Sequence, residues 1–243
     1  MGKIRFIQNY RIINKKILMQ NSHEYQFYGR KKGRKISKKG QELIDNLLPK
    51  VNLNLSNNNH QLDHLIEKKS PILLDIGFGS GDFLYQISRK KPKWNFIGID
   101  LYLNGIVSLL RKIEHKNNLN LRIVVDDARI ILNNFKSNSI SVITLLFPDP
   151  WRKTKHKSRR FIQLETVKQL YRILKPGGRL IISSDDDVMQ TWILKNLINY
   201  NLFDWKVKSI HDCFTKPKTF TKSKYFTKAE KVGRKSAWFI FSK

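Results

Sequence analysis

The sequence predicts an α/β fold with a mostly parallel β-sheet and helices on both faces. Short runs rich in Ile, Leu and Val alternate with stretches of helical apolar spacing, and this alternation is typical of a parallel sheet. The chain has 243 residues and a single Cys, and no apolar run approaches the ~20 residues of a membrane helix. We therefore expect a soluble cytoplasmic protein with a sizeable core, no disulfide framework and no membrane partner.

The alternation begins near residue 71. Seven apolar segments have the length and composition of strands: 71–77, 94–100, 121–127, 141–147, 179–185, 203–210 and 236–243. Five segments between them have helical spacing: 82–89, 104–116, 128–135, 160–174 and 188–199. A Lys-Pro-Gly-Gly sequence at 175–178 predicts a turn before the fifth strand, because Pro restricts φ and Gly allows positive φ.

The part of the chain before this alternation differs in composition. Residues 38–49 carry Leu and Ile at helical spacing, and we expect a helix that ends at Pro49. An Asn-rich connector follows at 51–60. Residues 1–37 are basic and lack apolar periodicity. We therefore predict a mobile N-terminal segment over 1–37 and a single domain over 38–243.

The positive charge is concentrated in three segments. The formal net charge is +28. Residues 1–40 carry 12 basic and one acidic residue, 151–160 carry six basic and none acidic, and 206–243 carry 11 basic and two acidic. Residues 41–150, in contrast, carry 13 basic and 11 acidic residues. Clustered cations release counterions when they bind a phosphate backbone, so we predict a nucleic-acid partner; a solvated basic surface is the alternative.

Glycines follow the first predicted strand. Gly77, Gly79 and Gly81 stand between this strand and the next helix, where residues without side chains let the backbone approach a ligand closely. A dinucleotide site needs one more residue before the third glycine, and Asp82 at the helix start would repel a pyrophosphate. The spacing therefore argues against a nicotinamide oxidoreductase.

Acids end three successive strands. Asp75 lies near the end of the first strand, Asp100 ends the second, and Asp127 ends the third. Carboxyl ends of parallel strands line one crevice, where an acid such as Asp100 accepts hydrogen bonds from ribose hydroxyls. Acids suit S-adenosylmethionine, which carries a sulfonium and an ammonium and no phosphate. Each acid alone would be interpreted as a helix cap or surface carboxylate, but three together predict this cofactor.

A Pro-rich loop follows the fourth strand. Residues 147–160 read FPDPWRKTKHKSRR, so Asp149 is expected in the crevice with six cations beside it to hold phosphates. The alternative is an acid in a tight turn that is followed by a solvated run of charges.

The sequence also bears on which atom would receive the methyl group of S-adenosylmethionine. Methylation of pyrimidine C5 needs a Cys nucleophile, and Cys213 lies outside the strand-end loops, so we do not expect this reaction. A ring nitrogen such as guanine N7 already presents a lone pair, and Asp149 could stabilise the positive charge that develops on the base.

These motifs together resemble bacterial tRNA (guanine-N7-)-methyltransferases over residues 25–243. The most specific motif of that family is F-P-D-P-W-x-K-x-x-H-x-K-R-R, which residues 147–160 match except at Ser158. The G-F-G-x-G loop and the L-x-P-G-G turn at 174–178 match as well, and 28–34 resembles the basic segment of a subgroup.

The resemblance implies a seven-stranded, Rossmann-like fold and methyl transfer from S-adenosylmethionine to N7 of guanosine 46 in the tRNA variable loop. It implies that Asp149 is catalytic. The cofactor-binding residues would be Asp75, Gly77, Gly79, Gly81, Asp100, Asp127 and Asp149. The RNA-binding residues would be Lys153, Asp185, Ser223, Lys224, Tyr225 and Phe226. We expect no metal, because the six histidines lack ligand spacing, and a monomer or weak homodimer.

One segment departs from the family. The family has T-[KR]-[FY]-E where residues 223–226 read Ser-Lys-Tyr-Phe. The missing Glu is expected to hold the guanine, and Phe226 cannot accept a hydrogen bond. Either Glu230 replaces it or base recognition is weaker. Another RNA methyltransferase, or a non-catalytic RNA-binding protein on the same fold, are the alternative functions.

Overall fold

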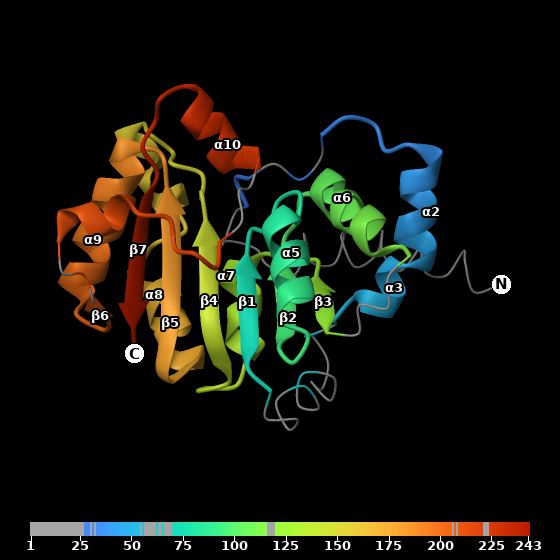
Figure 1. Ribbon diagram of the computed structural model, residues 1–243, viewed down its shortest axis with the longest axis horizontal. Coiled ribbons are helices and arrows are strands. Elements are labelled where there is room, and N and C mark those ends of the chain that lie inside the picture. Colours follow the sequence, from blue (N-terminus) through green and yellow to red (C-terminus); the bar gives the residue numbers. More distant parts are fainter. Residues whose placement is uncertain are drawn as a thin grey trace.

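The computed structural model describes residues 27–29, 31, 33–53, 55, 62, 65, 70–115, 120–205, 207, 209–220 and 224–243. These residues form a seven-stranded sheet with the order β3-β2-β1-β4-β5-β7-β6 (Figure 1). The strands are β1 (Ile72–Ile76), β2 (Asn95–Ile99), β3 (Leu121–Val124), β4 (Ile140–Leu146), β5 (Leu174–Ser184), β6 (Asp204–Trp205) and β7 (Ala237–Ser242).

The sheet is mostly parallel, as predicted. The five strands from β3 to β5 run parallel to one another, whereas β7 is antiparallel to both of its neighbours, β5 and β6. β6 is shorter than the predicted strand over 203–210, and the last residue of that prediction, Ile210, begins a short 3-10 helix, η3 (Ile210–Phe214). No helix in the described part of the chain is both long enough and apolar enough to cross a membrane.

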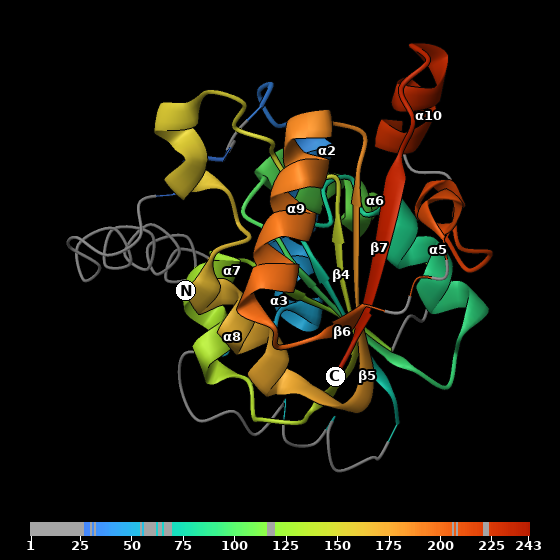
Figure 2. The same ribbon diagram turned by 90° about the vertical axis from the view of Figure 1, so that its left-hand side faces the viewer.

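Helices cover both faces of the sheet (Figure 2). One face packs against α2 (Lys38–Asn46), α3 (Leu48–Val51), α5 (Asp82–Lys90) and α6 (Leu103–Ile113). The other packs against α7 (Ala128–Ile131), η1 (Leu132–Asn134), α8 (Leu164–Ile173) and α9 (Asp187–Tyr200). Alternate residues of a strand point to opposite faces, so Leu73 joins the first core while Ile72 and Leu74 join the second.

The helix predicted over 38–49 is two helices. α2 begins at its cap Ser37 and ends at Asn46, before Pro49 is reached. Pro49 lies in the first turn of α3, where its missing N–H removes no helical hydrogen bond. The prediction that Pro49 ends the helix was therefore wrong. The connector that follows is described only in part; there, Asn52 pairs with Ile123 at the edge of the sheet.

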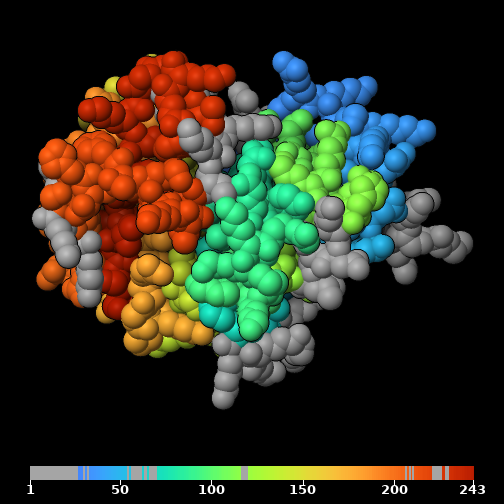
Figure 3. Space-filling view, in the orientation of Figure 1, coloured from blue at the N-terminus to red at the C-terminus, as the bar shows by residue number. Residues whose placement is uncertain are grey.

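The described end of the basic N-terminal segment lies along α6. The amide of Leu103 donates to the carbonyl of Lys31 at 3.0 Å, and the amide of Gly33 donates to Oδ1 of Asn104 at 2.7 Å. α2 then packs against α6, and the two helices are adjacent in the space-filling view (Figure 3). Residues 1–26 lie outside the described residues, and the division at residue 37 stays a prediction.

Two local features differ from the predicted elements. The Lys-Pro-Gly-Gly turn lies within β5 as an irregularity: Leu174 pairs with Ile140 and Arg179 pairs with Val142, and the residues between bulge outward. Gly177 there has a φ of 73°, a conformation that favours glycine. Besides η3, the described residues contain two helices that were not predicted, η2 (Thr154–Arg159) and α10 (Lys224–Lys231).

Candidate active site

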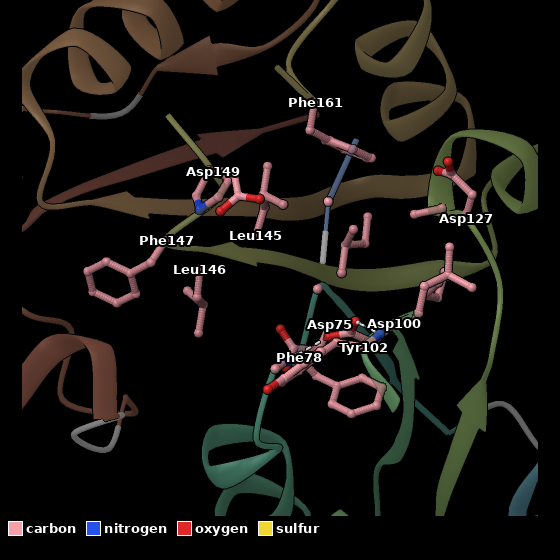
Figure 4. Close-up of a pocket in the computed structure, with 18 of the residues that line it drawn as sticks. Asp75, Phe78, Asp100, Tyr102, Asp127, Leu145, Leu146, Phe147, Asp149 and Phe161 are labelled. Atoms are coloured by element: carbon pink, nitrogen blue, oxygen red, sulfur yellow. Dashed lines mark hydrogen bonds between the residues drawn. The ribbon is translucent and has the colours of Figure 1, made fainter. Parts of the chain in front are cut away.

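A cavity of about 670 Å³ opens at the carboxyl ends of β1, β2, β3 and β4 (Figure 4). Its lining comes from the segments that follow these strands and from Phe27, Tyr28 and Gly29 of the N-terminal segment. The strand order reverses between β1 and β4, and such a switch point is where open α/β sheets bind ligands. The predicted crevice is therefore present.

The glycine loop after β1 forms one wall of the cavity. Gly77 has a φ of 70°, and a Cβ there would meet nothing within 4 Å, so its backbone faces open space. The amide of Gly79 donates to Oδ2 of Asp100 at 2.7 Å. Gly81 does not line the cavity; it is the N-cap residue of α5, with a φ of 69°, and a Cβ there would lie 2.8 Å from Leu109. Gly77 and Gly79 thus border the ligand space, whereas Gly81 allows α5 and α6 to pack closely.

Gly105 is a residue that the sequence analysis missed. It lies in α6, and a Cβ at this position would be 2.1 Å from the carbonyl oxygen of Gly79. The glycine loop can adopt its conformation only because this helix has no side chain there. No local sequence pattern marks the position, since Gly105 and Gly79 meet only in the folded chain.

We expect Gly105→Ala to displace the glycine loop and weaken S-adenosylmethionine binding by about tenfold or more, since overpacked sites shift backbone. Isothermal titration with the cofactor measures this effect. Gly40→Ala in α2 is the matched control, because the three atoms nearest to its Cβ would belong to side chains, those of Ile36, Val107 and Ser37, and not to backbone. Unchanged cofactor affinity in Gly105→Ala would contradict the proposed contact.

Asp100 holds the loop through both carboxylate oxygens. Oδ2 accepts from the amide of Gly79 and Oδ1 from the amide of Tyr102, both at 2.7 Å. Burial raises the pKa of Asp100, and the charge of Asp149 adds to this, although the backbone hydrogen bonds act in the opposite direction. Each carboxylate oxygen can accept a second hydrogen bond. The carboxylate can therefore organise the loop and bind a hydroxyl-bearing ligand at the same time.

Asp75 is the most buried acid of the cavity, with 2% of its surface exposed. Its Oδ1 accepts a hydrogen bond of 2.6 Å from the hydroxyl of Thr144 in β4. Burial raises the pKa of Asp75 to about 7, and the nearby charge of Asp100 also raises it, while the Thr144 hydrogen bond lowers it. A cationic ligand would compensate this buried charge.

The acids that follow β3 have different surroundings. Asp127 caps α7 by accepting from the amide of Arg129 at 3.0 Å, and it forms an ion pair of 2.6 Å with the guanidinium of the same residue. Its neighbour Asp126, absent from the predicted site, also lines the cavity, and burial raises the pKa of Asp126. Figure 4 shows Asp127 apart from Asp75 and Asp100.

Asp149 lies in the loop after β4, at the cavity wall and exposed to solvent. The loop is bounded by two residues with left-handed backbone conformations, Phe147 with a φ of 54° and Trp151 with a φ of 41°. Such conformations are rare for residues other than glycine and cluster at functional sites. The structure thus brings Asp149 to the cavity that Asp75 and Asp100 line, as predicted from strand order.

The charge of Asp82 would repel a pyrophosphate less than expected from its place at the helix start, because Lys112 compensates it. Asp82 begins α5, but the ammonium of Lys112 lies 3.2 Å from its carboxylate and also donates to the carbonyl of Ser80. The negative charge at the helix start is therefore compensated by α6. The exclusion of a dinucleotide then depends on the glycine spacing and not on this charge.

The described members of the predicted RNA-binding set, Lys153, Asp185 and Phe226, do not line the cavity. Lys153 is exposed before η2, and Asp185 forms an ion pair of 2.9 Å with Arg234. Phe226 packs against the ring of Trp238, with 6.2 Å between centroids. Ser223 and the side chains of Lys224 and Tyr225 lie outside the described residues.

Glu230, the candidate replacement for the missing Glu, is exposed on α10. The described residues contain no group of three or more His, Cys, Asp or Glu side chains that could hold a metal ion.

Comparisons with known proteins identify the family. A family model described as "Putative methyltransferase" matches residues 69–238. The tRNA (guanine-N(7)-)-methyltransferase of Agrobacterium fabrum is 34% identical over 88% of this chain and 94% of its own, and that of Bartonella henselae is 34% identical over 89% and 95%.

Solved structures support the fold. The 16S rRNA methyltransferase KamB superposes with a TM-score of 0.58 over 76% of this chain and 93% of its own, at 11% identity. The 16S rRNA (adenine(1408)-N(1))-methyltransferase of Catenulisporales acidiphilia gives a TM-score of 0.55 over 79% and 96%, at 16% identity. The family model and the sequence relatives show that the chain belongs to the tRNA (guanine-N(7)-)-methyltransferase family, and the strand order and the strand-end cavity agree with this.

Proposed function

We propose that this chain transfers a methyl group from S-adenosylmethionine to N7 of a guanosine in tRNA. The observation that carries the proposal is the cavity at the strand ends, in which Asp75, Asp100 and the glycine loop face the loop of Asp149. Relatives that match this chain over most of their length are named for this reaction. The cytoplasm is the compartment that fits such a substrate, and a monomer or weak homodimer is the assembly that we expect.

The cavity has the size and chemistry for S-adenosylmethionine. Its volume of about 670 Å³ is within the usual range for small-molecule sites, and the open space over Gly77 admits a ligand against the backbone. Asp100 is placed to accept hydrogen bonds from ribose hydroxyls. The buried carboxylate of Asp75 would bind the cationic methionine moiety, and Asp126 and Asp127 lie where the base of the nucleoside would end.

When bound, S-adenosylmethionine supplies an electrophilic methyl group. The protein has little proton transfer to perform, because guanine N7 has a lone pair before the reaction. Its part is to align this nitrogen with the methyl group and to stabilise the positive charge that appears on the base. Asp149 is at the cavity wall and carries the charge that suits this task. It is the residue that we assign to catalysis.

The tRNA would lie over the basic segment that follows Asp149. Lys153, Lys155 and Lys157 are exposed on and before η2, and acids are absent between residues 150 and 160. We assign Lys153 and Asp185 to the RNA substrate, together with the segment 223–226, and the variable-loop guanosine at position 46 as the target. Phe226 would then contribute packing rather than a hydrogen bond to the base.

Methyl transfer from labelled S-adenosylmethionine to unmodified tRNA, followed by nucleoside analysis, tests the proposal. The expected product is 7-methylguanosine. A matched transcript with adenosine in place of the variable-loop guanosine is the control and should accept no label. Label in another nucleoside would indicate a different RNA methyltransferase. Absence of both transfer and cofactor binding would support a non-catalytic RNA-binding protein.

Deleting residues 1–26 is expected to weaken tRNA binding and to flatten its salt dependence. The deletion removes five basic and one acidic residue but stops before Phe27, which lines the cofactor cavity. Each lost phosphate contact lowers the slope of log K against log salt by about 0.7–0.9. Filter binding at several salt concentrations measures the slope, and cofactor affinity should stay unchanged. An identical slope in both proteins would contradict the prediction.

A further inference from the structure

Arg160 is a buried arginine directly behind the loop of Asp149. Only 5% of its surface is exposed. Its Nε donates to the carbonyl of Pro150 at 2.9 Å, and its Nη2 donates to the carbonyl of Trp151 at 3.1 Å. These two carbonyls belong to the residues that follow Asp149, so one guanidinium holds the backbone on that side of the acid.

The guanidinium is itself held in place. It lies over the ring of Trp192 in α9, 4.5 Å from the centroid. The indole Nε1 of Trp192 donates to the carbonyl of Ile162 at 2.8 Å, which ties the ring to the chain just beyond Arg160. A planar cation that stacks on an aromatic ring and donates along two directions has little freedom to move.

The loop needs such support because its backbone is unusual. Phe147 and Trp151 have left-handed conformations, which non-glycine residues keep only when surrounding contacts stabilise them. Pro148 and Pro150 have no N–H groups and cannot donate backbone hydrogen bonds that would fix the loop. The amide of Phe147 donates to the carbonyl of Ser183 at 2.9 Å, and the side chain of Arg160 supplies two further donors from outside the loop.

A second arginine, Arg152, directly follows the loop in the chain and connects its end to α9. Arg152 forms ion pairs of 2.9 Å with Asp186 and Asp187 at the start of α9, but its side chain is 61% exposed. Exposed ion pairs contribute little to stability. Arg160 therefore holds the loop through buried hydrogen bonds, whereas Arg152 forms exposed ion pairs at its end.

We propose that Arg160 is a positioning residue for methyl transfer, which sets the place of Asp149 through the carbonyls of Pro150 and Trp151. The inference deepens the proposed function and depends on it. Arg160 acts through the backbone of the loop and touches neither substrate nor cofactor. Lys can supply an ammonium at this site but cannot reach two carbonyls as a planar fork does.

The test compares Arg160→Met, Arg160→Lys and Arg172→Met with the unchanged chain. Arg172 is the matched control: it donates to the carbonyls of Phe135 and Leu132, at 2.7 and 2.9 Å, and does not line the cavity. Both Met variants should lower the melting temperature. The rate constant of single-turnover methyl transfer at saturating tRNA should fall about 30-fold or more in Arg160→Met. The dissociation constants for S-adenosylmethionine and for tRNA should stay within about threefold of their values in the unchanged chain.

Partial recovery of the rate in Arg160→Lys and a normal rate in Arg172→Met would support positioning. A rate within about threefold of the original in folded Arg160→Met would overturn the inference. So would a loss that appears only as weaker cofactor or tRNA binding.

Hydrogen exchange of the peptide that contains residues 147–152 provides a readout without activity. It should become faster in Arg160→Met and stay unchanged in Arg172→Met. If the unchanged chain forms no 7-methylguanosine, the proposed function fails, but this exchange still tests whether Arg160 holds the loop. Unchanged exchange in Arg160→Met would overturn the inference, whatever the activity.

Discussion

Asp149→Ala is expected to lower the rate of methyl transfer by about 100-fold or more, which is the usual cost of removing one electrostatic contact to a transition state. The methylated base is cationic, and Asp149 is the acid of the loop that faces the cofactor cavity. The charge appears during the reaction and not on binding. We therefore expect nearly unchanged dissociation constants for S-adenosylmethionine and tRNA, and single-turnover kinetics separates the two effects.

Two further variants sharpen this measurement. Asp149→Asn keeps the shape of the side chain and removes its charge, so it should be nearly as slow as Asp149→Ala. Asp204→Ala is the matched control, because Asp204 is an exposed acid in β6 that does not line the cavity. Near-normal turnover in Asp149→Ala would reject the assignment of this residue to catalysis.

The affinity for S-adenosylmethionine is expected to fall by up to tenfold for each pH unit below about 7, since one protonation then competes with binding. Burial raises the pKa of Asp75 to about 7, so the carboxyl is increasingly protonated as the pH falls through this value. A cation binds the ionised form and would itself lower the pKa. Titration calorimetry from pH 5.5 to 8.5 measures the profile.

The same group links pH to the stability of the protein without cofactor. The pKa of Asp75 is higher in the fold than its ordinary value of 3.8, so the folded state binds the proton more tightly than the unfolded state. The buried charge lowers the free energy of unfolding. This cost is fully present above pH 7, decreases as the pH falls from 7 to 3.8, and is absent below pH 3.8. It amounts to ~4 kcal/mol at most, at ~1.4 kcal/mol per pKa unit. Asp75→Asn should therefore raise the melting temperature at pH 8 while weakening cofactor binding.

Thr144→Val is the matched variant for this prediction. The hydroxyl of Thr144 lowers the pKa of Asp75 by donating to its carboxylate, so its loss should move the midpoint of the binding profile above 7. Asp75→Asn should remove the midpoint altogether. A profile that is flat in the unchanged chain, or identical in Thr144→Val, would show that Asp75 does not control the pH dependence.

Much of this architecture could be predicted from local sequence patterns. Apolar runs with intervening helical spacing predicted the strands of the parallel sheet, because burial on both faces requires such runs. Placing Asp75, Asp100 and Asp149 in one cavity required only that carboxyl ends of parallel strands meet at one edge. The bounds of the elements were less predictable. Pro49 was assigned to a helix end although it lies in the first turn of the next helix, a position where proline is equally favourable.

Other features depend on contacts between residues that are distant in the chain, and such contacts leave no periodic pattern. Gly105 is needed because α6 crosses the carbonyl of Gly79, and Arg160 is buried because α9 brings Trp192 over it. The acids and glycines at the strand ends could be placed from local sequence, since each is positioned by its own strand. The side chains that hold these residues in position could be found only in the folded chain, because packing between helices and loops sets the distances between them.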